Sequence, residues 1–282
     1  MKDLGRRLVA SAISITVVVL ILCFAFLPWV MVLTAIALSV LSGIAVWEYN
    51  QFAREKGGMA KTSLLTLLAG FVTISFLLAA LKWPLFPEAA FILSILILFA
   101  HHFREKSGAI VNLAVSSFGL LYIALPLGMI LGILYGQHGQ DGRIWTAYLI
   151  ATTKITDIGG YFGGSLWGRR KLAPNISPGK TLEGALFGLA LSLVASFVFF
   201  LLGKSIEGLH FSLGSFEWIY LGVILGCIGQ FGDLSESLLK RDANKKDSNS
   251  LPGLGGALDA VDSLLFNAPI LYFYLLAVHG GA

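Results

Sequence analysis

The sequence predicts an all-α integral membrane protein. Its composition, the length of its apolar runs and the shortness of its loops all favour that fold class. Of its 282 residues, 56% are apolar and only 13% are charged, and the mean hydropathy is +0.81, which lies outside the range of soluble domains. Uncharged runs of roughly 20 residues, the length that crosses a bilayer, recur along the chain. The polar intervals between these runs are too short to form a separate soluble domain.

About nine transmembrane helices are expected, and each of them rests on one apolar run. The runs cover residues 8–27, 29–47, 62–81, 89–103, 109–135, 144–167, 184–203, 218–239 and 258–278. The first run follows a basic head, as in a signal peptide, but its apolar body is long and no small-residue cleavage site follows it. We therefore expect the first run to be retained as a membrane span.

The distribution of Lys and Arg predicts which side of the membrane each loop faces. With the N-terminus inside, 16 of the 20 cations fall in inside segments, three fall outside, and Lys154 lies within the sixth span. This pattern predicts a cytoplasmic N-terminus and a C-terminus outside, and the compact loops suit a bacterial inner membrane. The net charge of +4 fits anionic lipid. Nucleic acid is not an expected partner, because no aromatic residues are interleaved with the basic ones.

Acidic residues divide the apolar runs into two groups. Glu48 is the main acid among the first five runs, whereas the last four contain or begin with several. These acids of the second half are Asp157, Glu183, Asp233, Glu236, Asp259 and Asp262. We therefore expect residues 1–143 to form a scaffold of five helices that gives lipid access, and residues 144–282 to carry the catalytic loops on the cytoplasmic side.

The spacing of the acids at the start of the last run indicates a metal site. Asp259 and Asp262 share one helix face, with Cβ atoms roughly 5–6 Å apart, and no cation lies within the same turn. Mg²⁺ takes one or two carboxylates and completes its shell with phosphate oxygens and water. Asp233 and Glu236 repeat the spacing and are expected to complete the site from the facing helix. The alternative is a pair of solvated acids at a helix N-terminus, which is weaker for Asp233 because acids inside membranes are costly and usually functional.

Two inside loops supply cations that could hold phosphate. Lys240 and Arg241 end the eighth run, and Lys246 follows them; cations in such a place are also common beside an anionic leaflet without any ligand. In the other loop, we expect a turn at Pro174, Pro178 and Gly179. This turn leaves Lys180 and Thr181 at the mouth of the seventh span, where the backbone N–H groups of the helix start could also receive phosphate.

Two further patterns in this part of the chain have simple explanations. The stretch GKT at residues 179–181 differs from a P-loop, because Pro174 stands where that motif requires Gly and no strand is expected before it. Glycines recur four residues apart between Gly159 and Gly168, which favours close packing of this span against a neighbouring helix. Clustered carboxylates, cations from two loops and a bilayer together favour phosphoryl or nucleotidyl transfer to a lipid headgroup.

The charged C-terminal segment resembles the signature of the phosphatidate cytidylyltransferase family, also called CDP-diacylglycerol synthases. The matching residues are Ser237, Lys240, Arg241, Lys246, Asp247, Pro252, Gly253, Gly255, Gly256, Asp259 and Asp262. A second block of this family is similar to residues 157–184, with Asp157, Ser177, Pro178, Lys180, Thr181 and Glu183 in place. The specific resemblance covers about residues 150–267. Three features depart from the family pattern: Leu254 replaces a His, Ala260 replaces an Arg, and the loop after Asp247 is one residue short.

The resemblance implies that CTP and phosphatidic acid react to give CDP-diacylglycerol and pyrophosphate. On the physical argument above, Asp233, Asp259 and Asp262 would hold Mg²⁺ as catalytic residues together with Lys240, and a second cation is left open. The residues expected to bind the triphosphate or the lipid phosphate are Lys180, Thr181, Ser177, Arg241, Lys246, Asp247, Gly255 and Gly256. Supporting roles are expected for Asp157, paired with Lys154, and for Glu183 and Glu236.

Other functions remain as alternatives at this point. A related lipid-phosphate transferase with an altered substrate is one, given Leu254 and Ala260. A CDP-alcohol phosphotransferase is weaker, because Asp259 and Asp262 lack the Arg and the spacing of that pattern. An ion-coupled transporter would need broken inverted repeats in the two halves, whereas buried charge gathers in one half only. The sequence is also compatible with a homodimer.

Overall fold

The computed structural model describes residues 2–58, 60–104, 107–136, 139–206, 208–245 and 256–280, with side chains from residue 12 onward. Helices make up most of this part of the chain. The chain divides into two compact units: residues 1–136 together with 242–261, and residues 137–241 together with 262–282.

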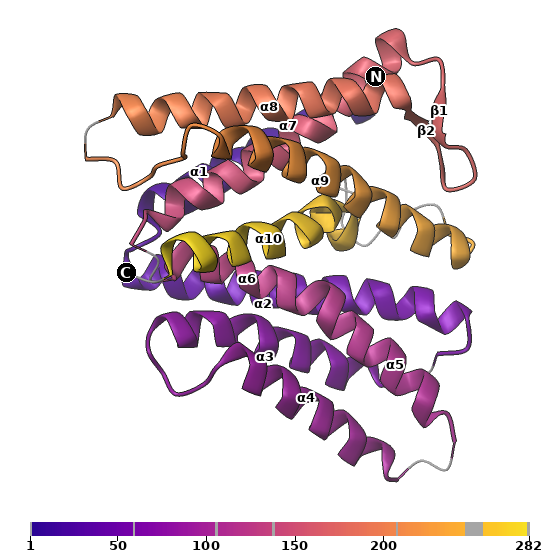
Figure 1. Cartoon of the computed structure of the whole chain (residues 1–282). Coiled ribbons are helices and arrows are strands. Elements are labelled where there is room, and N and C mark those ends of the chain that lie inside the picture. Colours follow the sequence, from indigo (N-terminus) through magenta and orange to yellow (C-terminus); the bar gives the residue numbers. More distant parts are fainter. Residues whose placement is uncertain are drawn as a thin grey trace. The chain divides into compact units, whose positions relative to one another are not determined.

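The first unit consists of the N-terminal helices and the short segment 242–261. Its elements are α1 (Lys2–Phe24), α2 (Pro28–Glu55), α3 (Thr62–Ala80), α4 (Pro87–His102), α5 (Ala109–Gly119), the π-helical turn η1 (Leu120–Ala124) and α6 (Leu125–Tyr135). Helix α3 packs against α2, α4 and α6 (Figure 1). At the junction of η1 and α6, the Thr73 hydroxyl donates to the Ala124 carbonyl at 3.1 Å, next to the helix-breaking Pro126.

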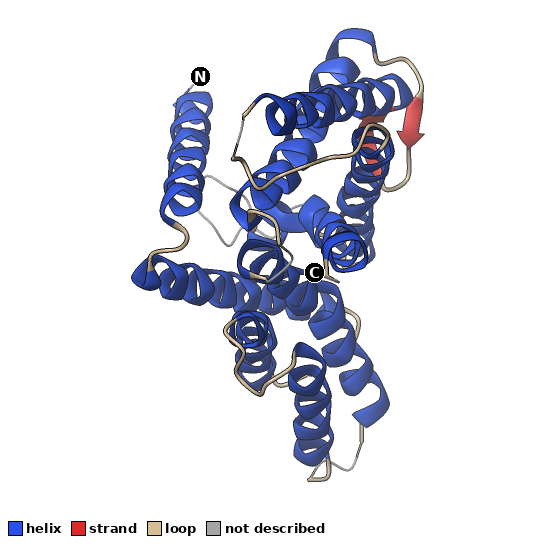
Figure 2. Ribbon diagram, turned by 60° about the vertical axis from the view of Figure 1, so that its left-hand side comes forward, coloured by secondary structure: helices blue, strands red, loops and turns tan. Residues whose placement is uncertain are grey.

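The second unit contains a β-hairpin between two long helices. Its elements are α7 (Gly142–Trp167), β1 (Lys171–Ala173), β2 (Ser177–Thr181), α8 (Leu182–Ser205), α9 (Glu217–Asp242) and the part of α10 (Ala257–His279) from Asp262 onward. Strands β1 and β2 pair antiparallel, and the hairpin projects where α7 ends and α8 begins (Figure 2). Serines of α8 bond to carbonyls of α9, from Ser192 to Gly222 at 2.8 Å and from Ser196 to Trp218 at 2.7 Å.

The helices confirm the predicted fold class. Each of the nine expected apolar runs forms helix. Within the described residues, 6 helices are long and apolar enough to cross a membrane: α2, α3, the continuous helix 109–135, α8, α9 and α10. Ala12–Phe24 and Pro87–His102 are shorter apolar helices. The protein is therefore a helical membrane protein, and the count of nine spans and the orientation stay predictions.

Glycines let α7 and α8 approach closely, as the four-residue repeat predicted. A Cβ atom on Gly159 would lie 2.9 Å from the Cα of Gly188, and one on Gly163 would lie 2.5 Å from the Cβ of Phe187. A Cβ on Gly184 would lie 2.6 Å from the carbonyl oxygen of Gly160. The two backbones thus touch where any larger residue would separate them.

A single added methyl group is expected to disturb this contact. The alanine Cβ in Gly184→Ala would meet backbone atoms that cannot rotate away, so we expect a loss of about 1–3 kcal/mol in stability and a fall in the unfolding temperature by several degrees. Thermal unfolding in detergent measures it. Gly160→Ala is the matched control, because its Cβ would meet only the Gly184 oxygen at 3.9 Å; an equal loss in both variants would contradict the packing argument.

The loop between α7 and α8 differs from its prediction. Residues 174–176 form the turn of the hairpin, whereas Pro178 and Gly179 lie within β2. The expected three-residue turn is therefore wrong at those two positions, and so is the expectation that no strand precedes the GKT stretch, because β1 does and β2 contains it. Lys171 pairs with Thr181 and Ala173 with Ser177, and this main-chain pairing keeps the segment extended. Strands this short show no alternating pattern of apolar residues from which they could have been predicted.

Candidate functional site

The second unit encloses a cavity of about 390 Å³ formed by α7, the β-hairpin, α8 and α9. Five of the predicted site residues line it: Asp157, Ser177, Lys180, Thr181 and Asp233. They come from three separate stretches of sequence and meet only through the fold. Polar side chains that the sequence did not single out, Thr156, Tyr161, Ser165 and Gln230, complete the polar part of the lining. A cavity with convergent polar groups is the best candidate for a binding site.

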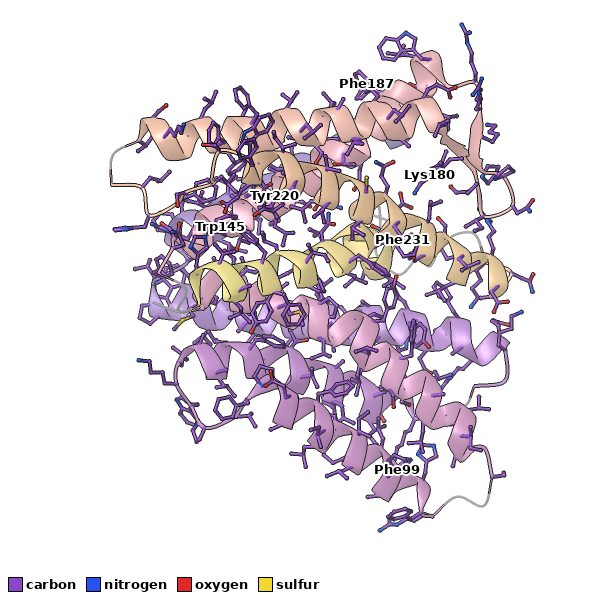
Figure 3. All side chains as sticks on the ribbon, viewed as in Figure 1. Phe99, Trp145, Lys180, Phe187, Tyr220 and Phe231 are labelled. Carbon is purple, nitrogen blue, oxygen red and sulfur yellow. The ribbon has the colours of Figure 1, made fainter. Side chains whose placement is uncertain are left out.

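Lys180 and Asp233 form the main charged contact across this cavity. The Lys180 Nζ lies 2.7 Å from Oδ2 of Asp233, and Figure 3 shows Lys180 in the space between the hairpin and α9. The two side chains are 25% and 33% exposed, whereas the Lys180 Nζ atom itself is buried, so a phosphate reaches this ammonium group only when the lysine side chain turns. Lysine binds phosphate and carboxylate binds a divalent metal, so the pair places the two charges that a metal–nucleotide complex requires.

A second group of charges lies beside this pair. Lys154 lies 3.8 Å from Asp157, one turn along α7, as the sequence predicted. The Ser263 hydroxyl donates to Asp157 at 3.3 Å, and Asp262, 8% exposed, accepts from the Ser263 amide. Asp157 and Asp262 both interact electrostatically with Asp233 and with Lys154. Three carboxylates and two lysines therefore share one region of the second unit.

These carboxylates have the right chemistry for Mg²⁺. In the described part of the chain, no group of three or more His, Cys, Asp or Glu residues is arranged to hold a metal ion. Mg²⁺ does not require such a group, since it takes one or two protein carboxylates and fills its shell with phosphate oxygens and water. One or two of these carboxylates would therefore suffice, and the assignment of the metal to Asp233, Asp259 and Asp262 together stays a prediction.

The start of α8 is closed by its own residues. The Thr181 hydroxyl accepts from the Gly184 amide at 3.1 Å, and the Leu182 amide donates to the Arg170 carbonyl at 2.9 Å. The amides of Leu182 and Gly184 are therefore already bonded within the protein, and phosphate binding at this helix start stays a prediction. Glu183 accepts from the amides of Arg169 and Arg170 at 2.9 and 3.1 Å. It thereby fixes the approach to the hairpin, and its supporting role in the reaction stays a prediction.

The end of α9 carries a separate set of contacts. Glu236 is fully buried and lies 2.5 Å from the Lys240 Nζ, a pairing that follows from their spacing on the helix. The Arg241 Nε donates to the Ile176 carbonyl in the hairpin turn at 3.1 Å. Glu236 thus contacts a lysine where the sequence analysis expected it to complete a metal site. Within the described residues, neither it nor Lys240 nor Arg241 lines the cavity.

The remaining predicted residues lie in or beside the segment 246–255. Lys246, Asp247 and Gly255 lie outside the described residues, as does Leu254. The Gly256 amide donates to Oδ2 of Asp259 at 2.9 Å in the first turn of α10. Asp259 thus reaches back from the first turn of α10 to the amide of the residue before the helix, as the acid of a capping box does.

Sequence reasoning missed two residues with marked polar environments. Gln230 lines the cavity and donates to the Ala185 carbonyl at 3.2 Å, and a polar residue three positions before Asp233 in an apolar run was its signal. Glu48 appeared only as an exception among the apolar runs. It is 1% exposed and accepts from the amides of Ala257 and Leu258, both at 2.8 Å.

Helical membrane spans, together with a cavity that sets a lysine against carboxylates, favour a membrane-embedded enzyme that acts on phosphate groups. Comparison with known proteins specifies the family. Residues 6–278 match the model of the cytidylyltransferase family, so the chain belongs to that family.

Two named relatives match the chain along nearly its whole length, and a third matches about half of it. It is 34% identical to the phosphatidate cytidylyltransferase of Chlamydia pneumoniae over 97% of this chain and 92% of the relative. It is 30% identical to that of Haemophilus influenzae over 97% of this chain and 99% of the relative. A match to the Bacillus subtilis phosphatidate cytidylyltransferase reaches 44% identity over 48% of this chain and 49% of the relative.

Proposed function

We propose that this protein joins CTP and phosphatidic acid into CDP-diacylglycerol and releases pyrophosphate. The observation that carries the proposal is the pair of Lys180 and Asp233 facing each other in one cavity, in a membrane protein of the cytidylyltransferase family. The cavity of about 390 Å³ falls in the range of small-molecule sites, roughly 300–1,000 Å³. It is therefore large enough to take a nucleotide or part of one.

The reaction needs charge compensation more than a strong base. An oxygen of the lipid phosphate, already ionised at neutral pH, forms a bond to the α-phosphorus of CTP as the bond to the departing pyrophosphate breaks. Lys180 lies where it can stabilise the negative charge that moves onto the leaving group. Asp233, Asp259 and Asp262 would hold Mg²⁺, which neutralises phosphate charge when bound.

The placement in the membrane belongs to the same proposal. We expect nine spans with the N-terminus in the cytoplasm and the C-terminus outside, in a bacterial inner membrane. The hairpin with Arg169, Arg170 and Lys171 is then on the cytoplasmic side, where CTP is available. Positive loops next to membrane spans favour that side, and an anionic lipid substrate approaches it from the adjacent leaflet.

The first test is pyrophosphate release by detergent-purified protein. We expect release only when CTP, phosphatidic acid and Mg²⁺ are all present, and we expect an excess of EDTA over Mg²⁺ to abolish it. Release from folded protein without phosphatidic acid would contradict the lipid as acceptor. Absence of release with all three present would overturn the proposal and direct attention to other lipid phosphates and nucleotides, given that Leu254 and Ala260 replace a His and an Arg of the family pattern.

A further inference from the structure

One face of α2 contacts the chain on both sides of the segment 246–255. This α2 face consists of Glu48, Phe52 and Glu55, whose spacing of four and three residues places them on one side of the helix, together with Lys56, which directly follows the helix. All of its contacts described here lie within the first unit. The segment matters because it carries Lys246 and Asp247 of the family signature and is followed by Asp259.

Before the segment, the contacts of the α2 face are exposed ion pairs. Lys56 lies 3.0 Å from Asp242, and the two side chains are 49% and 65% exposed. Lys245 lies 3.1 Å from Glu55, and its Nζ is 6.0 Å from the ring centre of Phe52. Exposed pairs of this kind contribute little because water and salt screen them. These ion pairs show that residues 242–245 lie beside the end of α2, but they add little to the stability of that arrangement.

After the segment, the contact is of another kind. Glu48 is 1% exposed, and its two carboxylate oxygens each accept one backbone amide, from Ala257 and from Leu258, at 2.8 Å. Charge-assisted bonds of this length are among the strong hydrogen bonds. A helix N-terminus also favours a negative charge. The next amide donor on the N-terminal side, Gly256, is held by Asp259.

We propose that Glu48 is a positioning residue for the reaction: it fixes the first turn of α10 and with it the catalytic Asp259. The expected effect on the reaction rests on the proposed function. The anchoring of α10 by Glu48 rests only on the hydrogen bonds to Ala257 and Leu258. It follows that the start of α10, although it resembles an anion site, is filled by the protein's own carboxylate. It also gives the N-terminal half, which carries little chemistry of its own, a direct part in arranging the catalytic residues.

The test compares Glu48→Gln with the unaltered protein by amide hydrogen exchange and by turnover. A glutamine keeps the size of the side chain but offers one acceptor and two donors, so one of the two amides loses its partner. We expect faster exchange at Ala257 and Leu258. We also expect turnover to fall roughly tenfold to a hundredfold, as for other residues that orient ligands, with a higher Mg²⁺ concentration for half-maximal rate and an unchanged KM for phosphatidic acid.

Two controls separate positioning from a general loss of stability. Ser42→Ala removes a buried polar atom from the same helix, and Glu88→Gln makes the same chemical change at an exposed acid of α4; both should keep the exchange and the Mg²⁺ dependence of the unaltered protein. Glu48→Asp retains the charge and is the gentler variant if the glutamine does not fold. Its amide exchange rates and its turnover should lie between those of the unaltered protein and those of Glu48→Gln.

Each outcome decides one part of the proposal. Unchanged exchange at Ala257 and Leu258 in both Glu48 variants would overturn the anchoring contact. Faster exchange with unchanged turnover and Mg²⁺ dependence would overturn the positioning role. If the unaltered protein releases no pyrophosphate, the proposed function fails, and the exchange data still decide whether Glu48 holds the start of α10.

Discussion

Asp259→Asn should reduce turnover by about a hundredfold to a thousandfold while leaving the protein folded. The substitution removes one negative charge from the expected metal site, and loss of a group that stabilises transition-state charge commonly costs a hundredfold to a thousandfold or more. Asparagine has the same shape, and its side-chain oxygen can still accept the Gly256 amide, which lies 2.9 Å from Asp259. Asp259 is only half-buried, so water can reach the amide group of the new asparagine and the substitution should cost little stability.

The measurement is the rate of CTP-dependent pyrophosphate release together with the unfolding temperature in detergent. Asp242→Asn is the matched control, because it makes the same change at the end of α9, where the carboxylate is 65% exposed and pairs with Lys56. We expect the control to stay within about twofold of the unaltered rate, since exposed pairs contribute little. Normal turnover in Asp259→Asn would contradict the assignment of this residue as a metal ligand.

The helices could be predicted because the bilayer imposes a simple rule. A backbone in hydrocarbon must satisfy its own hydrogen bonds, so each apolar run of sufficient length forms a helix, as the structure confirms. The rule fixes the runs but not the details within them. The π-helical turn Leu120–Ala124 and the hairpin Lys171–Thr181 depend on contacts with other segments. Neither has a period that single-sequence reasoning can detect.

The sequence predicted which residues belong to the candidate site better than it predicted which of them contact each other. The pair of Glu236 and Lys240 could have been inferred from their spacing of four residues on one helix. The pair of Lys180 and Asp233 could not, because it joins a strand to a helix far along the chain. Glu48 was visible as a lone acid in an apolar run, a known sign of function. Its partners are backbone amides, which leave no mark on side-chain patterns.

Lys180→Met should lower kcat/KM for CTP by about a hundredfold to a thousandfold, a loss expected for removal of a cation that stabilises a departing phosphate. The protein should remain folded, because the charge left on Asp233 is 33% exposed and water can solvate it. Steady-state kinetics at varied CTP measures the effect. Lys171→Met is the matched control. It removes the same charge from the same hairpin, but its exposed side chain does not line the cavity described here, so its rate should stay near that of the unaltered protein.

The same variant also tests whether the pair of Lys180 and Asp233 must separate when substrates bind. Lysine has to turn to a phosphate and Asp233 to a metal, so the ion pair competes with both ligands. Without Lys180, Asp233 is free of that competition. The KM for CTP should therefore rise while the Mg²⁺ concentration for half-maximal rate falls. If the two constants rise together, Lys180 assists metal binding through the nucleotide; if neither changes, Lys180 does not contact the nucleotide at all.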